Sequence, residues 1–309
     1  MMCIKERNAS DSTCKKLLRD KGCFADLCNY AFFQGRQVIQ PEELVSREND
    51  LSTLIGKVDK PTEIKRYRDV VRKASIHGEY VIIGVEHQRT FDEKMVFRIL
   101  NYDATIYINQ VESKQEIYPV GSFVFYTGDK EWKSPETLKE TLKNIPPEME
   151  PYINDWRLPV VELKTMDARE LTNQRLKEVV EISQSMFAGN YDDLRNNRKI
   201  EIENFMMAAT FTRTKIKRED LPEGDEINMC EAMDRLFQRF ENQGMEKGKI
   251  IGFEKGKSDT LKEQLKVKLG TLSRPLEKQL TNTSLEKLNE LTLNIFNVTN
   301  EDDVLRIIN

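Results

Sequence analysis

The sequence has few of the residues that hold soft metals or cross-link a secreted domain. Its 309 residues include two histidines and five cysteines, and no two cysteines form a CxxC pair. This composition gives no zinc-binding pattern. An odd number of loosely spaced cysteines is typical of reduced thiols, and we therefore expect a cytoplasmic protein.

Long apolar runs are also missing. The run Tyr80–Val85 is among the longest, and it is far below the roughly 18 residues of a membrane-spanning helix. The N-terminus lacks the apolar segment of a signal peptide. These two absences exclude a membrane-spanning protein, and no membrane partner is expected.

The charges almost balance, with 48 Lys and Arg against 52 Asp and Glu and a net charge of −4. A general binder of polyanions would be basic, so that class is disfavoured, while a local basic groove stays open. Charged residues make up 32% of the chain and hydrophobic residues 39%. Because typical globular domains are richer in apolar residues, we expect a globular part followed by solvated helices.

The patterning changes near residue 165. Before it, helix and strand patterns alternate, and the strongest strand signal is the β-branched, almost continuously apolar run 80–88. Such a run is typical of a strand that is buried on both faces. The predicted helices are 13–33, 91–108 and 134–143, and the predicted strands are 69–76, 80–88, 116–127 and 159–163. This order predicts one α/β domain over residues 1–165, with a mixed sheet flanked by helices.

The chain after residue 165 is expected to be all-helical. The sequence predicts a helical region over 166–243, a Gly/Lys-rich connector over 244–259 and a small helical unit over 260–309. Glycine recurs every fourth residue in the connector, and each glycine inside a helix costs about 1 kcal/mol relative to alanine. We therefore interpret this segment as solvated and semi-flexible. The alternative is a close helix–helix contact along the glycines. A homo-oligomer formed through the helical C-terminal region is a further expectation.

Two acids and an amide form the main candidate site. Asp69 begins one predicted strand, Glu86 lies near the end of the next, and Gln88 follows two residues later. Because side chains alternate along a strand, Glu86 and Gln88 face the same way, and a hairpin can bring Asp69 beside them. Two converging carboxylates suit Mg²⁺ or Mn²⁺. Such a metal can generate hydroxide and stabilise charge on a phosphodiester, while Gln88 orients the attacking water.

The alternative interpretation of this spacing is ordinary strand structure. Asp69 would then only begin a strand, and Glu86 would be a solvated strand end, since short motifs often match by chance. Asp26, in the first predicted helix, is taken as a third candidate metal ligand after Asp69 and Glu86, with a place on the helix surface as the alternative. For Asn29, three residues later, the surface is the favoured interpretation. His87 should face away from Glu86 and serve in packing or at the surface.

Cations surround the acidic centre. Residues 60–73 hold six of them against two acids, which suits binding of a phosphodiester backbone. On the next predicted helix Lys94, Arg98 and Tyr102 recur every four residues and share one face. The residues expected to bind nucleic acid are Arg68, Arg72, Lys73, Lys94, Arg98 and Tyr102. The alternatives are an ordinary basic loop, a solvated Lys94 and a Tyr102 that packs in the core.

An ordered series of short motifs carries a family resemblance. The motifs are Phe24–Asn29, Pro41–Leu44, Arg68-Asp69, Ile83–Gln88, Arg98–Asp103 and Val124–Trp132, followed by Pro135. Each is short, but the series over residues 14–165 resembles the recombination-promoting nuclease/putative transposase family (Rpn), a bacterial branch of the PD-(D/E)xK nucleases. The connector and the helical C-terminal unit also look like the tails that follow this domain.

The resemblance implies a restriction-endonuclease-like fold and Mg²⁺-dependent hydrolysis of phosphodiester bonds in DNA. It implies that Asp69 and Glu86 are metal ligands and that Gln88 stands at the usual lysine position. A neutral amide there departs from the superfamily pattern, although members of this family resemble the chain in carrying it. Our hypothesis is that Lys94 or Arg98 supplies the missing charge.

Three functions compete at this stage. The first is a metal-dependent DNA endonuclease linked to recombination or mobile elements. The second is a catalytically degenerate module that binds DNA or a partner protein, which Gln88 and the acidic net charge favour. The pair Asp69 and Glu86 argues against it, because a binding module does not need two carboxylates that repel each other. The third is a helical oligomer whose C-terminal tail recruits other proteins.

Overall fold

The computed structural model of the chain describes residues 4–45, 70–114 and 116–309. Asp69 and Arg68, two of the predicted site residues, therefore lie outside the described residues. The chain divides into two compact units, Met1–Asp234 and Arg235–Asn309. Within the described ranges, no helix combines the length and the apolar character that crossing a membrane requires.

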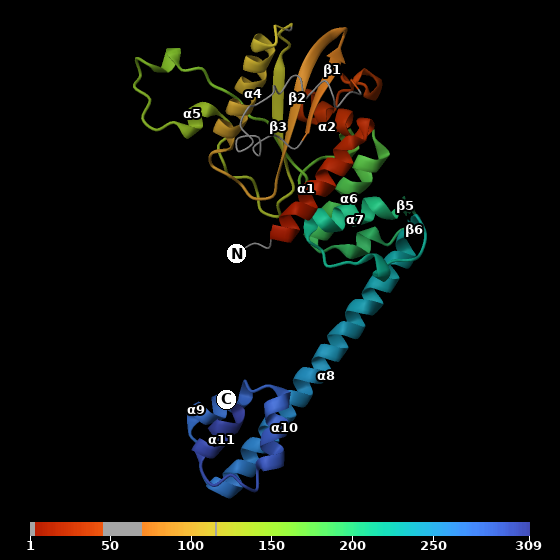
Figure 1. Ribbon diagram of the computed structural model, residues 1–309. Helices are drawn as coiled ribbons and strands as arrows, with labels where there is room; N and C mark the ends of the chain where they lie inside the picture. The colour runs from red at the N-terminus through yellow and green to blue at the C-terminus, as the bar shows by residue number, and fades with distance from the viewer. Residues whose placement is uncertain (1–3, 46–69, 115) are drawn as a thin grey trace. The chain divides into compact units, whose positions relative to one another are not determined.

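The first unit is built on a four-stranded mixed sheet, as predicted (Figure 1). Its strands, in spatial order, are β1 (Val70–Ile76), β2 (Glu79–Gln88), β3 (Val120–Tyr126) and β4 (Val160–Glu162). The predicted hairpin is confirmed, because β1 pairs with β2 in antiparallel fashion, whereas β2–β3 and β3–β4 are parallel. His77 and Gly78 form the hairpin turn with φ values of 53° and 88°. Two positive φ values are the signature of the tight turns that match the twist of a hairpin.

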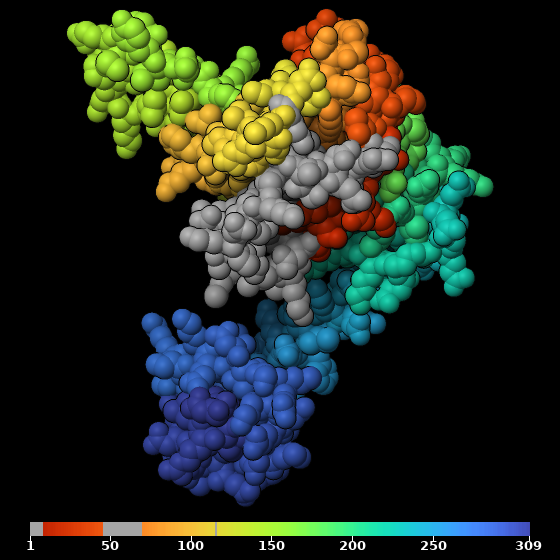
Figure 2. All heavy atoms as spheres, turned by 45° about the horizontal axis from the view of Figure 1, so that its top comes forward, coloured from red at the N-terminus to blue at the C-terminus, as the bar shows by residue number. Residues whose placement is uncertain are grey.

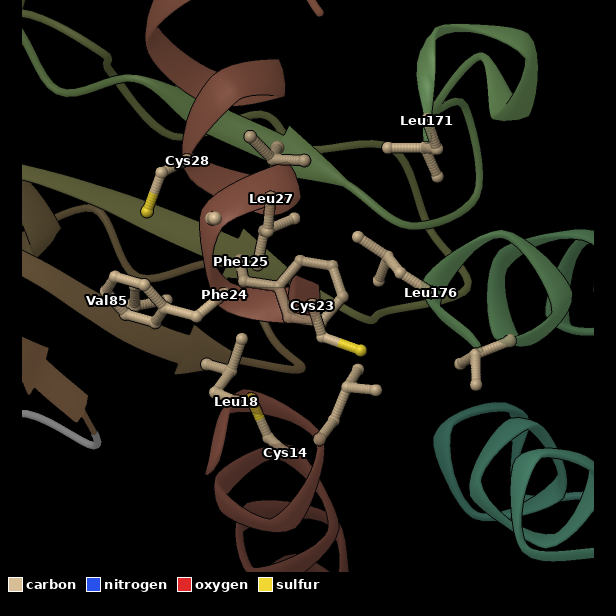
Figure 3. Close-up of a cluster of buried hydrophobic side chains, with 14 of the residues drawn as sticks. Cys14, Leu18, Cys23, Phe24, Leu27, Cys28, Val85, Phe125, Leu171 and Leu176 are labelled. Atoms are coloured by element: carbon tan, nitrogen blue, oxygen red, sulfur yellow. The ribbon is translucent and has the colours of Figure 1, made fainter. Parts of the chain in front are cut away.

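Helices cover both faces of the sheet. On one face lie α1 (Ile4–Arg19), α2 (Lys21–Phe33) and α6 (Gln174–Ala188), whose apolar side chains form the main core with the sheet. Figure 3 shows Phe24 and Leu27 of α2 against Val85 and Phe125 of the sheet. On the other face α4 (Met95–Glu112) packs on β3 through a second cluster. The centre of β2 is therefore buried on both sides, as its apolar run predicts.

Buried cysteines belong to the main core (Figure 3). Burial raises the pKa of the Cys28 thiol well above its ordinary value. Burial also raises the pKa of Cys23, and Asp20 beside it adds to the effect. Thiols with raised pKa values stay protonated and are poor nucleophiles, so both side chains serve as small apolar groups.

The rest of the first unit is mostly helical. Its other elements are η1 (Pro41–Glu43), α5 (Leu138–Thr141), η3 (Glu150–Tyr152), η4 (Ala168–Glu170), η5 (Tyr191–Leu194), β5 (Lys199–Glu201), α7 (Ile202–Thr212), η6 (Arg218–Asp220) and β6 (Glu226–Asn228). The segment that carries α5 and η3 extends from the sheet beside α4 (Figures 1 and 2). After residue 165 this unit is mostly helical, but it is not all-helical as expected, because it includes the antiparallel ribbon β5–β6. The ribbon pairs Ile200 with Ile227, both buried between exposed neighbours.

The second unit contains most of α8 (Met229–Leu269) and three short helices. These are α9 (Arg274–Thr281), α10 (Leu285–Asn294) and α11 (Glu301–Ile308). Their core is formed by leucines of α8 and of the short helices, with Leu265 fully buried. The predicted connector 244–259 is part of the continuous helix α8. Among the described residues, nothing lies within 4 Å of the position a Cβ would take at its glycines, so no close helix contact uses them.

A pair of substitutions on α8 tests the core of the second unit. We expect Leu265→Ala to destabilise this unit by about 2–5 kcal/mol, because it leaves a cavity in a closely packed cluster. Val267→Ala, two residues on and 89% exposed, should change the stability by less than about 0.5 kcal/mol. Hydrogen exchange of α9–α11 in the full chain, measured in urea, gives both values. Equal effects of the two substitutions would contradict the packing described here.

Candidate active site

Glu86 and Gln88 lie on the same face of β2, near the carboxyl end of the strand. Gln88 Nε2 donates a hydrogen bond to Glu86 Oε1 at 3.1 Å. The two residues are only 5% and 7% exposed. His87 lies between them in the strand and Val85 precedes them. Both point to the opposite face, where Val85 joins the main core. The alternation that the sequence predicts therefore sets an acid and an amide side by side in a buried position.

Arg98 of α4 completes this group. Its Nη2 donates to Glu86 Oε1 at 2.6 Å, and its Nη1 donates to Asp92 Oδ2 at 3.0 Å. The guanidinium thus joins an acid of the sheet to an acid at the start of the helix. Arg98 reaches the sheet because Met95 and Ile99, on either side of it, are buried against β3.

The charges of this cluster shift the pKa values of its members. Burial alone would lower the pKa of Arg98, but the Glu86 charge and hydrogen bonding to Tyr102 and Asp92 outweigh it and raise the pKa. Burial would likewise raise the pKa of Asp92, but the Lys94 backbone N–H and the Arg98 side chain lower it. Arg98 and Asp92 are therefore charged at neutral pH. Lys94 stands at the exposed N-cap of α4.

The donor atoms of this cluster are of the kind that Mg²⁺ prefers, a carboxylate and an amide oxygen. Among the residues that the structure describes, however, no group of three or more His, Cys, Asp or Glu is placed to hold a metal ion. Mg²⁺ often takes one or two carboxylates and completes its shell with waters and substrate phosphates. Glu86 and Gln88 fit such a site as part of its ligand set, and Asp69 remains the predicted second carboxylate.

Asp103 is a buried acid that the sequence interpretation did not single out. It lies on α4, is 1% exposed and accepts a hydrogen bond from Ser122 Oγ at 2.7 Å. Ser122 is paired with Gly84, two residues before Glu86. Asp103 therefore lies on the Glu86 face of the sheet and ties α4 to β3. The sequence does mark this residue, because Asp103 recurs at helical spacing with the apolar residues Ile99 and Ile106.

The structure places Asp26 on the other side of the sheet. Its carboxylate accepts hydrogen bonds from the backbone N–H groups of Thr172 and Asn173, both at 2.9 Å, and from Gln37 Nε2 at 3.1 Å. These contacts join α2 to the start of α6 and account for the burial of this acid. Asn29 also binds backbone groups: its Nδ2 donates to the Ile39 carbonyl, and its Oδ1 accepts from the Ile39 N–H. The sheet separates Asp26 from Glu86.

Two cations predicted to bind nucleic acid also have partners within the fold. Arg72 Nη2 donates to the carbonyl oxygens of Leu18 and Arg19 at 3.0 and 2.9 Å, at the carboxyl end of α1. Lys73 Nζ lies over the rings of Tyr80 and Tyr118, 4.0 and 3.8 Å from their centroids. Because the two residues are adjacent in β1, their side chains point to opposite faces of the sheet. Arg72 stabilises the end of α1 on one face, and Lys73 makes cation–π contacts on the other.

His87 packs on the face opposite Glu86. Its Nδ1 lies 3.0 Å from Asp11 Oδ1 and its Nε2 lies 2.8 Å from Thr127 Oγ1. Its ring lies against Phe125 and Phe211. This arrangement is the packing role that the alternation of β2 predicts.

A family comparison covers the part of the chain that carries the cluster. Residues 62–212 match the family described as "Putative transposase, YhgA-like". The match confirms the family resemblance drawn from the sequence and includes Glu86, Gln88 and Arg98. No curated protein and no solved structure matches the chain.

Asp26→Ala distinguishes a structural acid from a metal ligand. The substitution removes the acceptor for two backbone N–H groups, so we expect a loss of about 1–3 kcal/mol in the free energy of unfolding. Asp225→Ala, at an exposed position, should change it by less than about 0.5 kcal/mol. Urea unfolding followed by circular dichroism measures both. Unchanged stability together with lost Mg²⁺ binding would instead make Asp26 a ligand.

Proposed function

We propose, from the premise that residues 62–212 belong to the YhgA-like putative transposase family, that the chain is a metal-dependent DNA endonuclease. It would hydrolyse phosphodiester bonds with Mg²⁺ or Mn²⁺ in a reaction linked to recombination or mobile elements. Moving a DNA segment requires that DNA strands be broken, which is the chemistry that the family description and the Glu86 cluster support together.

The observation that carries the proposal is the cluster of Glu86, Gln88 and Arg98, in which Glu86 and Gln88 are buried and the Arg98 side chain is 35% exposed. Burial removes the Glu86 charge from water, and this cost offsets much of its attraction to the partly exposed Arg98. Such a pair therefore adds little to stability. Charged side chains that shift one another's pKa values, as Arg98 and Asp92 do here, are common at reactive centres. The cluster also stands near the carboxyl end of β2, where the resemblance implies a catalytic site.

Each residue has a defined role in this proposal. Glu86 and Asp69 would hold the metal, and Gln88 would orient the attacking water through its amide. The bound metal would supply a hydroxide nucleophile and stabilise charge on the phosphodiester. Arg98 would supply the positive charge that the neutral Gln88 lacks. The structure favours Arg98 over Lys94 for this role, because Arg98 contacts Glu86 directly and Lys94 is exposed.

A second candidate function is a catalytically degenerate module that binds DNA or a partner protein. One observation favours it: Glu86 Oε1 already accepts hydrogen bonds from both Arg98 and Gln88. A metal would have to compete with these two donors for the carboxylate. Binding without chemistry would leave the hydrogen bonds of the cluster unchanged when Mg²⁺ is added.

Plasmid cleavage by the purified chain tests the proposed activity. We expect cleavage with Mg²⁺ or Mn²⁺, none with EDTA, and at least about a 100-fold lower rate for Glu86→Gln and Asp69→Ala, since each removes charge at the reacting phosphate. Glu178→Gln is the matched control, because Glu178 is also a buried glutamate but contacts Gln174 and Asn204. Folded protein that binds DNA but cleaves under no condition would favour the degenerate module. Cleavage that survives in both site variants would mean that the active site lies elsewhere.

Arg98→Gln and Lys94→Gln separate the two cations that could support Gln88. We expect Arg98→Gln to lower the cleavage rate by about 100-fold and DNA affinity by less than about threefold, because its charge acts on the transition state. Lys94→Gln should leave the rate within about threefold. Unfolding curves of each variant show whether loss of activity is loss of fold. A normal rate in folded Arg98→Gln would reject this role.

A further inference from the structure

A cavity of about 330 Å³ opens where β2 and β3 end. Residues from the ends of β2, β3, α6 and α7 and from the loops that follow them line it, among them Arg89, Phe91, Tyr126, Lys130, Phe187 and Arg213. Arg89 follows Gln88 in the chain, and the Thr127 backbone N–H donates to the Gln88 carbonyl at 2.8 Å. The cavity therefore begins one residue from the proposed reactive centre. None of the roles proposed above uses it.

Aromatic rings form much of its wall. Tyr126 is almost fully buried and meets Trp132 edge-on, with 5.1 Å between the ring centroids. Phe211 packs edge-on against Phe125, with 6.2 Å between the centroids. Gly128 passes directly over the Tyr126 ring, because a Cβ there would lie 2.3 Å from its Cζ. These contacts fix the inner rings in place. Phe91, in contrast, is 46% exposed, which suits a ring that closes over a ligand.

The same cavity carries an excess of positive charge. Three cations line it against a single acid, Asp129. Arg89 Nη2 donates to the Phe211 carbonyl at 3.1 Å and so holds the end of α7 in place. Lys130 and Arg213 are exposed, so a ligand in the cavity can reach their charges. The charge balance therefore favours an anionic ligand.

We propose that this cavity binds one unpaired nucleotide of a DNA single strand. The base would stack on Phe91 above the buried rings, and the adjoining phosphate would contact Arg213 and Lys130. Proteins that bind single strands combine such stacking rings with a basic groove, and every base offers a face for stacking. An apolar peptide would leave the cations unused. The inference rests on the proposed function, because it takes DNA as the ligand, and it deepens that function by placing a single-stranded end where the strand that carries Glu86 ends.

Binding of labelled DNA in EDTA tests this proposal without cleavage. The probes are a blunt duplex, the same duplex with a short single-stranded overhang, and that overhang with abasic sites. Phe91→Ala removes the exposed ring, and Arg213→Gly removes a cation at a residue with φ of 58°, which glycine adopts without strain. Tyr152→Ala and Lys215→Ala, at exposed positions outside the cavity, are the matched controls.

We expect the wild-type chain to bind the overhang about 5- to 100-fold more tightly than the blunt duplex or the abasic overhang. Phe91→Ala should remove this preference and keep the salt dependence. Arg213→Gly should lower the slope of log affinity against log salt by about 0.7, the value for one lost phosphate contact on a single strand. Both controls should bind as the wild type does.

Four outcomes would overturn the proposal. Unchanged overhang preference in both cavity variants, or an abasic overhang that binds as well as the intact one, would remove the cavity from DNA binding and leave the endonuclease proposal standing. Full competition by a free deoxynucleotide without any overhang preference would assign the cavity to a free nucleotide instead of a strand. Absence of DNA binding by the wild type would end the proposed function and the cavity's role together.

Discussion

The ion pair between Arg98 and Glu86 is the interaction on which the candidate site depends. It joins α4 to β2 at 2.6 Å, and the second arm of the guanidinium holds Asp92 at the start of the helix. Apolar packing brings the pair together, because Met95 and Ile99 are buried against β3 on either side of Arg98. The core thus positions two charges that would contribute little to stability by themselves, and it fixes the orientation of the carboxylate next to Gln88.

The sheet separates structural polar groups from the candidate chemistry. On the face that carries α1 and α2, Asp26 binds the backbone before α6, Arg72 binds the end of α1, and His87 packs among aromatic rings. On the face that carries α4, Glu86 and Gln88 meet Arg98. Since a shift of one residue moves a strand side chain to the other face, the faces of Arg72, Glu86, His87 and Gln88 follow directly from the register of β1 and β2. The cavity lies at the ends of β2 and β3 and has walls from both sides of the sheet, Tyr126 on one and Phe211 on the other.

The sequence was sufficient for the features that depend on local periodicity. The apolar run 80–88 predicted a strand buried on both faces, and the alternation predicted that Glu86 and Gln88 share a face. The spacing on α4 grouped Arg98 with Lys94 and Tyr102 but left open whether that face meets the sheet. Partners distant in sequence were not predictable from spacing alone. Asp26 and Arg72 looked like site residues because their partners, Thr172 and the carbonyls of α1, are set by tertiary packing. The short ribbon β5–β6 is stabilised in the same way, by one buried isoleucine pair. Asp69 lies outside the described residues, and its role stays a prediction.

Metal binding to the intact chain tests the central claim most directly, namely that the Glu86 face of the sheet is the metal site. Mn²⁺ titrations followed by electron paramagnetic resonance would compare the wild type with Glu86→Gln and Asp26→Asn. The account predicts a bound Mn²⁺ in the wild type and in Asp26→Asn, and a loss of this site in Glu86→Gln. Equal Mn²⁺ binding by the wild type and Glu86→Gln, with the fold intact, would contradict it.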